Sequence, residues 1–165
     1  MRLGRKILIG TGIAAGIGGL AWGINYVLSK KKVGDKLDTV TTAMIHSLKL
    51  NGLTLRIDVI LKNPTEGTLT IKQPYIKVLF ENKVIATSQI QNKEIVIAKY
   101  GAKPIEPIYL TIPATGLLTL GDGLFKVLLK KQPAKITTIT ITSLKIGSKY
   151  ITYEKPDVIT LKPKA

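Results

Sequence analysis

Residues 51–62, NGLTLRIDVILK, decide the fold class of this 165-residue chain. From Leu53 onward every second residue is apolar, and one face collects Leu53, Leu55, Ile57, Val59 and Leu61. This alternation predicts a β-strand with one buried face. The preceding Asn51-Gly52 is the strongest short hairpin signal, so we expect a two-residue turn that pairs Leu50 with Leu53.

The expected register of this hairpin places the chain's one histidine, His46, opposite Ile57 and places Met44 opposite Val59. Both side chains would then lie on the apolar face of the hairpin. A lone histidine there is more often packed than catalytic, because a general base also needs an orienting partner. We therefore expect a structural role for His46.

Further strand signals follow at short intervals, at 69–71, 76–80, 84–86, 95–97, 108–112, 136–141, 149–153 and 158–161. Residues 115–130 instead carry leucines near helical spacing and close on Lys130-Lys131, which suits a helix C-terminus. Gly121 and Gly123 leave the start of that helix poorly defined, and Pro133 ends it. The pattern predicts an all-β fold with one helix: an antiparallel β-sandwich of the fibronectin or immunoglobulin type.

The amino-terminal segment has the character of a membrane anchor. Residues 7–28 form 22 consecutive uncharged positions, which as a helix would span about 33 Å against a hydrocarbon core of roughly 30 Å. A cleaved signal peptide is the alternative, but the apolar stretch is longer than usual and no small-x-small pattern follows it. We expect residues 1–32 to be a retained anchor and residues 33–165 to be one β-sandwich domain.

The anchor carries three sets of candidate contact residues. Trp22 and Tyr26 suit the headgroup level. Four glycines within about 60° of one helix face would admit a second helix, although glycine is also simply common in membrane helices: Gly12, Gly16, Gly19 and Gly23. Basic residues at both flanks would contact anionic headgroups, which leaves the orientation open: Arg2, Arg5, Lys6, Lys30, Lys31 and Lys32.

The charge balance favours anionic partners. The chain has 25 basic and 10 acidic residues; the first 32 residues hold six of the basic ones and none of the acidic ones, which leaves 19 − 10 = +9 for the remainder. Such a surface suits phospholipid headgroups, nucleic acid or an acidic protein, although surplus charge also keeps a domain soluble. With only three arginines, base-specific DNA recognition is not expected.

Several segments together resemble the water-stress and hypersensitive-response domain of group-2 late embryogenesis abundant proteins: VILKNPT (59–65), TLTI (68–71), PYIKV (74–78), KVIATS (83–88) and PIYLTIP (107–113). The resemblance covers about residues 37–161. It implies a fibronectin-like sandwich with a helix, tethered in some members behind one membrane span, and no active site. Within its motif, Asn63-Pro64 can end a strand, since proline cannot donate to the ladder and asparagine favours turns.

No constellation for catalysis or metal binding is apparent in the sequence. The ten acidic residues are scattered, and the chain has no cysteine. Gly121-Asp122-Gly123 lacks the Lys-Ser/Thr ending and the βαβ setting of a phosphate loop, so we expect a turn or helix cap there. We predict no catalytic residue, no cofactor and no metal.

Three functions stay open, and we prefer the first. It is a non-enzymatic, single-pass membrane protein whose sandwich is a structural or interaction module in a cell envelope or a membrane-containing virion, with the bilayer and other protein subunits as partners and with possible self-association. The second is a stress-protective or lipid-contacting role like that of the resembled family. The third is non-specific, lysine-mediated binding of nucleic acid beneath a membrane.

Overall fold

The computed structural model describes residues 36–119 and 124–162. Strands dominate this part of the chain, and all their pairings are antiparallel. The elements are β1 (Asp38–Lys49), β2 (Gly52–Lys62), β3 (Leu69–Lys72), β4 (Tyr75–Phe80), β5 (Lys83–Thr87), β6 (Glu94–Ile97), β7 (Ala102–Pro104), β8 (Ile108–Pro113), α2 (Ala114–Thr119), α3 (Leu124–Leu129), β9 (Ala134–Ile146) and β10 (Lys149–Leu161). The predicted antiparallel, β-rich domain is confirmed.

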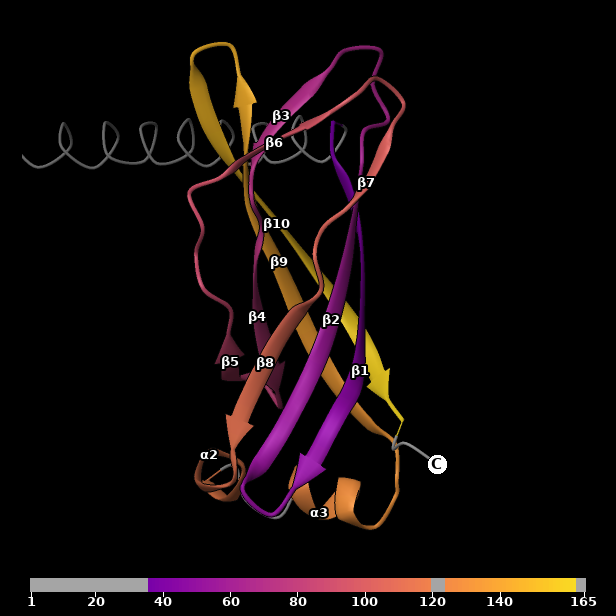
Figure 1. Ribbon diagram of the computed structural model, residues 1–165, viewed down its shortest axis with the longest axis vertical. Helices are drawn as coiled ribbons and strands as arrows, with labels where there is room; N and C mark the ends of the chain where they lie inside the picture. The colour runs from indigo at the N-terminus through magenta and orange to yellow at the C-terminus, as the bar shows by residue number, and fades with distance from the viewer. Residues whose placement is uncertain (1–35, 120–123, 163–165) are drawn as a thin grey trace, which may run out of the picture.

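The strands form two sheets that pack face to face (Figure 1). In the first sheet β2 is central: β1 pairs with one side of it, and β8 and β7 pair with successive parts of the other side. In the second sheet β9 is central: β10 lies along one side, and β4 and β3 pair with the other, followed outward by β5 and β6. The open edges of the two sheets therefore belong to short strands on one flank and to β1 and β10 on the other.

The core between the sheets has the predicted face of β2 at its centre. Leu53, Leu55, Ile57, Val59 and Leu61 are each at most 1% exposed. They pack with buried side chains of the second sheet, among them Ile71, Ile76, Val78, Ile136 and Leu144. Full burial of one such side chain contributes roughly 1.5–3 kcal/mol relative to leaving it in water. The predicted phase of this strand is confirmed.

The predicted turn of the first hairpin is wrong by one residue. Leu50 and Asn51 form the turn, and Lys49 pairs with Gly52. The reason is tertiary: Gly52 has a φ of +152°, and a Cβ there would lie 2.4 Å from the carbonyl oxygen of Ile112 in β8. Glycine is thus used for a close approach of two strands and not for the turn itself.

The shifted turn moves the pairing by two residues and so leaves the same face of β1 turned to the core: Leu48 pairs with Leu53 instead of Leu55. The face changes at a bulge, where His46 is the extra residue between Ile45 and Ser47. Beyond this bulge Thr41 pairs with Val59 and Ala43 with Ile57, so Met44 is 49% exposed and His46 is exposed as well. The prediction that His46 and Met44 lie on the apolar face is therefore wrong.

Two other predicted boundaries also change. The single helix expected over 115–130 is two short helices, α2 and α3, and Gly121-Asp122-Gly123 lies between them, outside the described residues. The two strands expected near the carboxyl end are one continuous strand, β10, which contains Pro156. β10 pairs on one side only, where a proline is tolerated and discourages further pairing.

Part of the contact between the sheets is polar. Thr39 and Thr41 of β1 face inward, as do Thr138, Thr140 and Thr142 of β9. The hydroxyls of Thr41 and Thr140 lie 2.7 Å apart and form a hydrogen bond across the two sheets. Burying hydroxyls is tolerated when they are hydrogen-bonded.

No helix within residues 36–119 and 124–162 is long and apolar enough to cross a membrane. The helix predicted at 7–28 lies outside the described residues.

Candidate functional site

The domain has two ends of different construction. We call the open end the loops and strand ends formed by residues 36–38, 62–69, 98–103 and 145–150, at the top of Figure 1. We call the helical end the turn and helices formed by residues 49–52, 113–119 and 124–135, at the bottom of Figure 1. The described chain begins at the open end, at Lys36.

Asn63 holds the loops of the open end together. It directly follows β2, as predicted for a strand-ending Asn-Pro, and it is 2% exposed. Its side-chain amide donates hydrogen bonds to the carbonyls of Gly67 (2.6 Å), Ala98 (2.9 Å) and Ile97 (3.3 Å). Its side-chain oxygen accepts from the backbone N–H of Thr65 (2.9 Å) and from the Thr65 hydroxyl (2.7 Å). Both polar atoms of this buried side-chain amide make hydrogen bonds. The Asn63-Pro64 motif therefore has a structural role.

The next turn along this end carries an exposed tyrosine in an uncommon conformation. The N–H of Gly101 donates to the carbonyl of Ala98 (2.9 Å), so Tyr100 is the third residue of a tight turn. Tyr100 has a φ of +51° and is 65% exposed. Glycine or asparagine is preferred at such a position. Hydrogen bonds from Tyr100 to Thr65 and from Asn63 to Gly101 fasten this turn to the Asn63 loop.

A second exposed tyrosine stands among lysines on the β9–β10 hairpin. The ring of Tyr150 has the ammonium of Lys72 at 4.9 Å and that of Lys145 at 5.9 Å from its centroid. Both distances permit cation–π attraction. The Tyr150 hydroxyl donates a hydrogen bond to Glu94, and this bond raises the pKa of Tyr150. The ring thus joins β10 to the neighbouring edge of the sheet.

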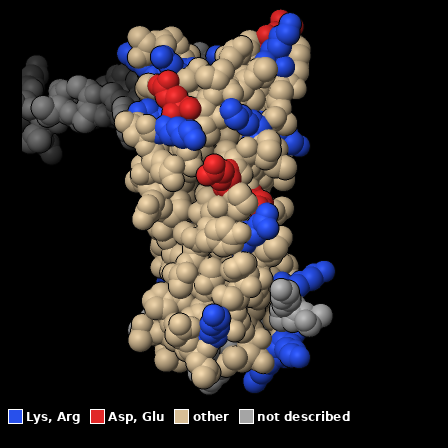
Figure 2. All heavy atoms as spheres, in the orientation of Figure 1, with Lys and Arg blue, Asp and Glu red and all other residues tan. Residues whose placement is uncertain are grey.

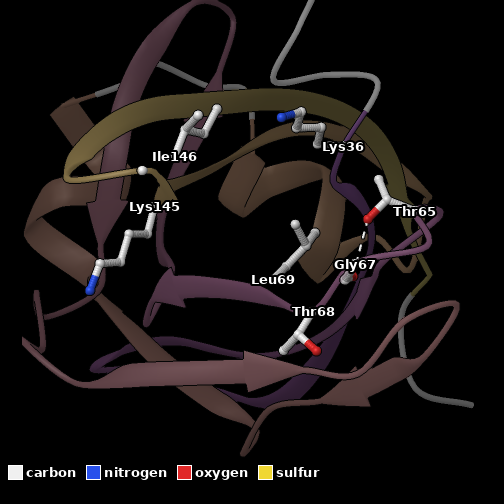
Figure 3. A pocket seen from close by; sticks show the side chains of 8 residues that line it. Lys36, Thr65, Gly67, Thr68, Leu69, Lys145 and Ile146 are labelled. Carbon is white, nitrogen blue, oxygen red and sulfur yellow. Dashed lines mark hydrogen bonds between the residues drawn. The ribbon is translucent and has the colours of Figure 1, made fainter.

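A cavity of about 370 Å³ opens between these loops. Figure 3 shows Leu69 at its centre, the Lys36 side chain reaching over it, and the Lys145 side chain pointing away. The remaining lining comes from Thr65, Gly67, Thr68, Ile146 and Gly147. The apolar side chain of Leu69 lies beneath the ammonium group of Lys36. This combination suits an amphipathic or anionic ligand better than a neutral polar ligand.

Both ends are basic. The open end has six lysines and two acidic residues, a balance of 6 − 2 = +4, and one of the two, Asp38, is paired with Lys155. The ranges that define the helical end contain five lysines and no acidic residue. Figure 2 shows blue side chains near both ends of the face in view. Charge alone therefore does not choose the functional end.

The helical end exposes apolar side chains in place of tyrosines. Leu50 is 90% exposed, Leu118 66% and Leu129 53%. Beneath them Leu117, Leu124 and Leu128 are at most 1% exposed and close the core. The first N–H of α2, from Ala114, donates to the carbonyl of Asn51 (3.0 Å) and holds the hairpin tip in place.

The flank between β5 and β8 is a groove of about 530 Å³. β5 pairs only with β4 and β8 only with β2, so both strands present unpaired backbone groups toward this flank. The groove is lined by Gln73, Pro74, Ala86, Thr87, Ser88, Gln89, Gln91, Glu106, Pro107, Ile108, Tyr109, Leu110 and Thr111. Open strand edges are the surfaces on which extended peptides add as further strands.

The opposite flank is closed by an ion pair. The ammonium of Lys155 in β10 lies 2.8 Å from the carboxylate of Asp38 in β1 and also donates to the carbonyl of Thr39. The hydrogen bond from Lys155 lowers the pKa of Asp38, and the same bond raises the pKa of Lys155. The two edge strands are tied together at this point.

No group of three or more His, Asp or Glu side chains that could hold a metal ion occurs in the described part of the chain. His46, the one histidine, is exposed, and its ring meets that of Tyr109 edge-on at 5.0 Å. This arrangement differs from the buried setting that the sequence predicts for it.

Most of the predicted contact residues belong to the predicted anchor. The residues of the predicted anchor lie outside the described part of the chain: Arg2, Arg5, Lys6, Gly12, Gly16, Gly19, Trp22, Gly23, Tyr26, Lys30, Lys31 and Lys32. Asn63 and Pro64 lie at the open end. Sequence reasoning missed Tyr100 and Tyr150, for which the available signal is a Lys-Tyr pair beside a glycine-containing turn, at 99–101 and 147–150.

No family model and no curated protein matches the chain. Among solved structures, a protein from Archaeoglobus fulgidus is similar with a TM-score of 0.51 and 11% identity over 78% of this chain and 98% of its own. A protein from Arabidopsis thaliana has a TM-score of 0.51 and 13% identity over 77% and 82%. A structure described as a late embryogenesis abundant protein has a TM-score of 0.46 and 11% identity over 97% and 95%. At such identities the likeness concerns the fold alone.

Proposed function

We propose that this chain is a non-enzymatic, single-pass membrane protein whose β-domain stands on a bilayer as a structural or interaction module. The observation that carries the proposal is that Lys36 and the first residue of β1, which follow the predicted anchor in sequence, lie at the open end. Lys36 lies at the open end, four residues after the basic run at Lys30–Lys32 and 36 − 28 = 8 residues after the predicted end of the anchor. Eight residues reach at most about 29 Å.

This short connection restricts how far the domain can move from the bilayer. β9 and β10 each have 13 residues and run between the two ends, a length of about 43 Å for an extended strand. With the open end tethered, an upright domain presents its helical end and its β5–β8 groove to other molecules. The exposed leucines and the open strand edges then support protein partners, in a cell envelope or a virion membrane.

We also infer that the two sheets form a fibronectin- or immunoglobulin-like sandwich and that the chain is a distant member of the resembled late embryogenesis abundant family. The position of Asn63-Pro64 at the end of β2, as the hub of the loops that follow, supports this. Alignment of homologous sequences tests it: membership predicts that Asn63 persists where the flanking strands persist, and free variation of Asn63 would contradict it.

The anchor is tested by extracting membranes of expressing cells with alkaline carbonate. The proposal expects the full chain in the pellet and an intact mass that includes residues 1–28. A chain that begins beyond Leu28, or one that is released by carbonate, would contradict it.

The partner class is tested by purifying the full chain under mild detergent. A structural role predicts co-purifying protein at fixed stoichiometry that withstands moderate salt. Retention of nucleic acid that salt abolishes would instead favour the lysine-mediated alternative. A monomer that protects client proteins from aggregation would favour the stress-protective one.

A further inference from the structure

We propose that the open end is itself a membrane-contacting surface, in which Tyr100 and Tyr150 enter the headgroup layer of an anionic leaflet and the surrounding lysines bind lipid phosphates. This inference rests on the proposed anchor. It adds a second contact with the bilayer, which is made by residues of the β-domain. It assigns the lipid-facing side of the domain, and it makes Tyr100 a residue that positions the domain on the bilayer.

The backbone of Tyr100 is in the left-handed region. A turn position with a φ of +51° is occupied at least cost by glycine or asparagine, yet it holds a bulky side chain that is 65% exposed. The turn is fastened by hydrogen bonds to the Asn63 loop, so the ring is presented from a fixed support. An aromatic side chain that costs stability and buries little surface in its own domain is suited to contact something outside it.

Lysines flank both tyrosines. Lys99 and Lys103 flank Tyr100 in sequence, and Lys145 and Lys149 flank Tyr150. Tyrosine has an apolar ring and a polar tip, which suits the boundary between headgroups and acyl chains. Lysines near an anionic membrane surface are attracted to its lipid phosphates, and the attraction falls off within a Debye length. The pairing of rings with ammonium groups is the composition of an interfacial surface.

The predicted anchor is joined to the open end. The helical end is slightly more basic and more apolar, so composition does not exclude it as the lipid contact. Lys36, however, belongs to the open end, and 35 residues that include the predicted anchor precede it. A bilayer surface is therefore always close to the open end, which raises its effective concentration there.

The test uses the full chain, which contains no cysteine, with one cysteine introduced at a time. Gly67→Cys labels the open end, where a Cβ meets nothing within 4 Å. Lys49→Cys labels the exposed helical end. Each labelled protein is reconstituted in vesicles of phosphatidylcholine, with or without phosphatidylglycerol, and quenching by a headgroup nitroxide lipid is measured.

We expect several-fold stronger quenching at Gly67→Cys than at Lys49→Cys in anionic vesicles, and a weaker difference in neutral vesicles or high salt. Adding Tyr100→Gly should lower quenching at the open end while the melting temperature stays equal or rises. Lys99→Gln with Lys149→Gln should also lower it, whereas the matched pair Lys130→Gln with Lys131→Gln should not.

Equal quenching at both ends, stronger quenching at the helical end, or no effect of Tyr100→Gly would overturn this inference while the chain still floats with vesicles. A chain that does not float with vesicles overturns the anchor proposal and this inference together. Lower quenching in Tyr100→Gly combined with a lower melting temperature would also overturn it, because Tyr100 would then be needed for folding.

Discussion

The two ends of the domain are held together by different interactions, apolar packing at the helical end and hydrogen bonds at the open end. At the helical end, α2 and α3 cover the core with Leu117, Leu124 and Leu128, which are at most 1% exposed. At the open end, no helix of the described chain covers the core, and one buried amide, Asn63, ties two loops together by hydrogen bonds. Apolar packing gives stability with little directional precision, whereas hydrogen bonds fix the position of loops. The open end is therefore the end suited to present side chains in set places.

The largest expected effect comes from removing packing at the helical end. Leu117→Ala should lower the free energy of unfolding by about 2–5 kcal/mol, because a buried leucine leaves a cavity. Urea unfolding of the full chain in detergent measures it. Leu118→Ala, beside it but 66% exposed, is the matched control and should change stability by less than about 0.5 kcal/mol. Equal effects of the two would show that the helices do not close the core.

The matching change at the open end is Asn63→Ala. It removes the donors and acceptors that satisfy the loop carbonyls and Thr65, so we expect a loss of about 1–3 kcal/mol. Hydrogen exchange should rise in residues 63–68 and 98–101 and stay unchanged in α2. Asn63→Asp retains an oxygen that can accept the hydrogen bonds of Thr65. Hydrogen exchange at Thr65 should therefore rise less in Asn63→Asp than in Asn63→Ala. Unchanged exchange in these loops would refute the fastening role.

The third substitution, Tyr100→Gly, should raise the free energy of unfolding. Tyr100→Gly removes a side chain from a left-handed position, which relieves about 1–2 kcal/mol and is partly offset by the extra chain entropy of glycine. We expect a net gain on the order of 0.5 kcal/mol, from the difference of these terms. Thermal unfolding measures it, and Tyr100→Ala, which keeps the Cβ, should show no gain. A loss of more than about 1 kcal/mol would mean that the Tyr100 ring packs on the domain.

The smallest effect concerns the ion pair beside the open end. The pKa of Asp38 is lowered in the folded state by its hydrogen bond from Lys155. The ionised Asp38 therefore stabilises the folded state at pH values above its unfolded pKa, and this stabilisation is lost as the pH falls through its folded pKa. The pKa of Lys155 is raised, so its contribution is lost only at strongly alkaline pH. The Asp38 side chain is 49% exposed, so solvent screening keeps the contribution of the pair to roughly 0.2–0.5 kcal/mol.

Asp38→Asn should therefore lower the melting temperature slightly at neutral pH; the difference from the parent chain should begin to shrink below about pH 4, near the unfolded pKa of aspartate, and should vanish once the pH is below the lower folded pKa. A difference that persists at pH 2 would contradict this account.

Local patterns in the sequence were sufficient for the element types and for the buried face of β2. The alternation in residues 53–62 depends only on chain geometry, and the predicted strand end at Asn63-Pro64 follows from the chemistry of those two residues. The hairpin turn was missed because the constraint on Gly52 comes from Ile112, some 60 positions away. The inward threonines of β1 were missed because the bulge at His46 shifts the register by one residue and so turns the other face of β1 to the core.

The candidate site was less predictable than the fold. Asn63 is recognisable as a strand terminator, but the sequence does not reveal that its amide reaches Gly67 and Ala98. Tyr100 and Tyr150 are separated by 50 positions, and only the topology brings their turns to one end of the domain. Surface side chains leave no periodic signal, because no packing constraint selects them.

The proposed arrangement requires the tethered domain to stand upright on the bilayer, with its long strands directed away from the membrane. Neutron reflectometry of the full chain in a supported anionic bilayer measures the thickness of the protein layer directly. The account predicts a protein layer about 40 Å thick beyond the headgroups, close to the length of a 13-residue strand. A layer of about 20 Å, the depth of two packed sheets with their outer side chains, or the absence of any layer, would contradict it.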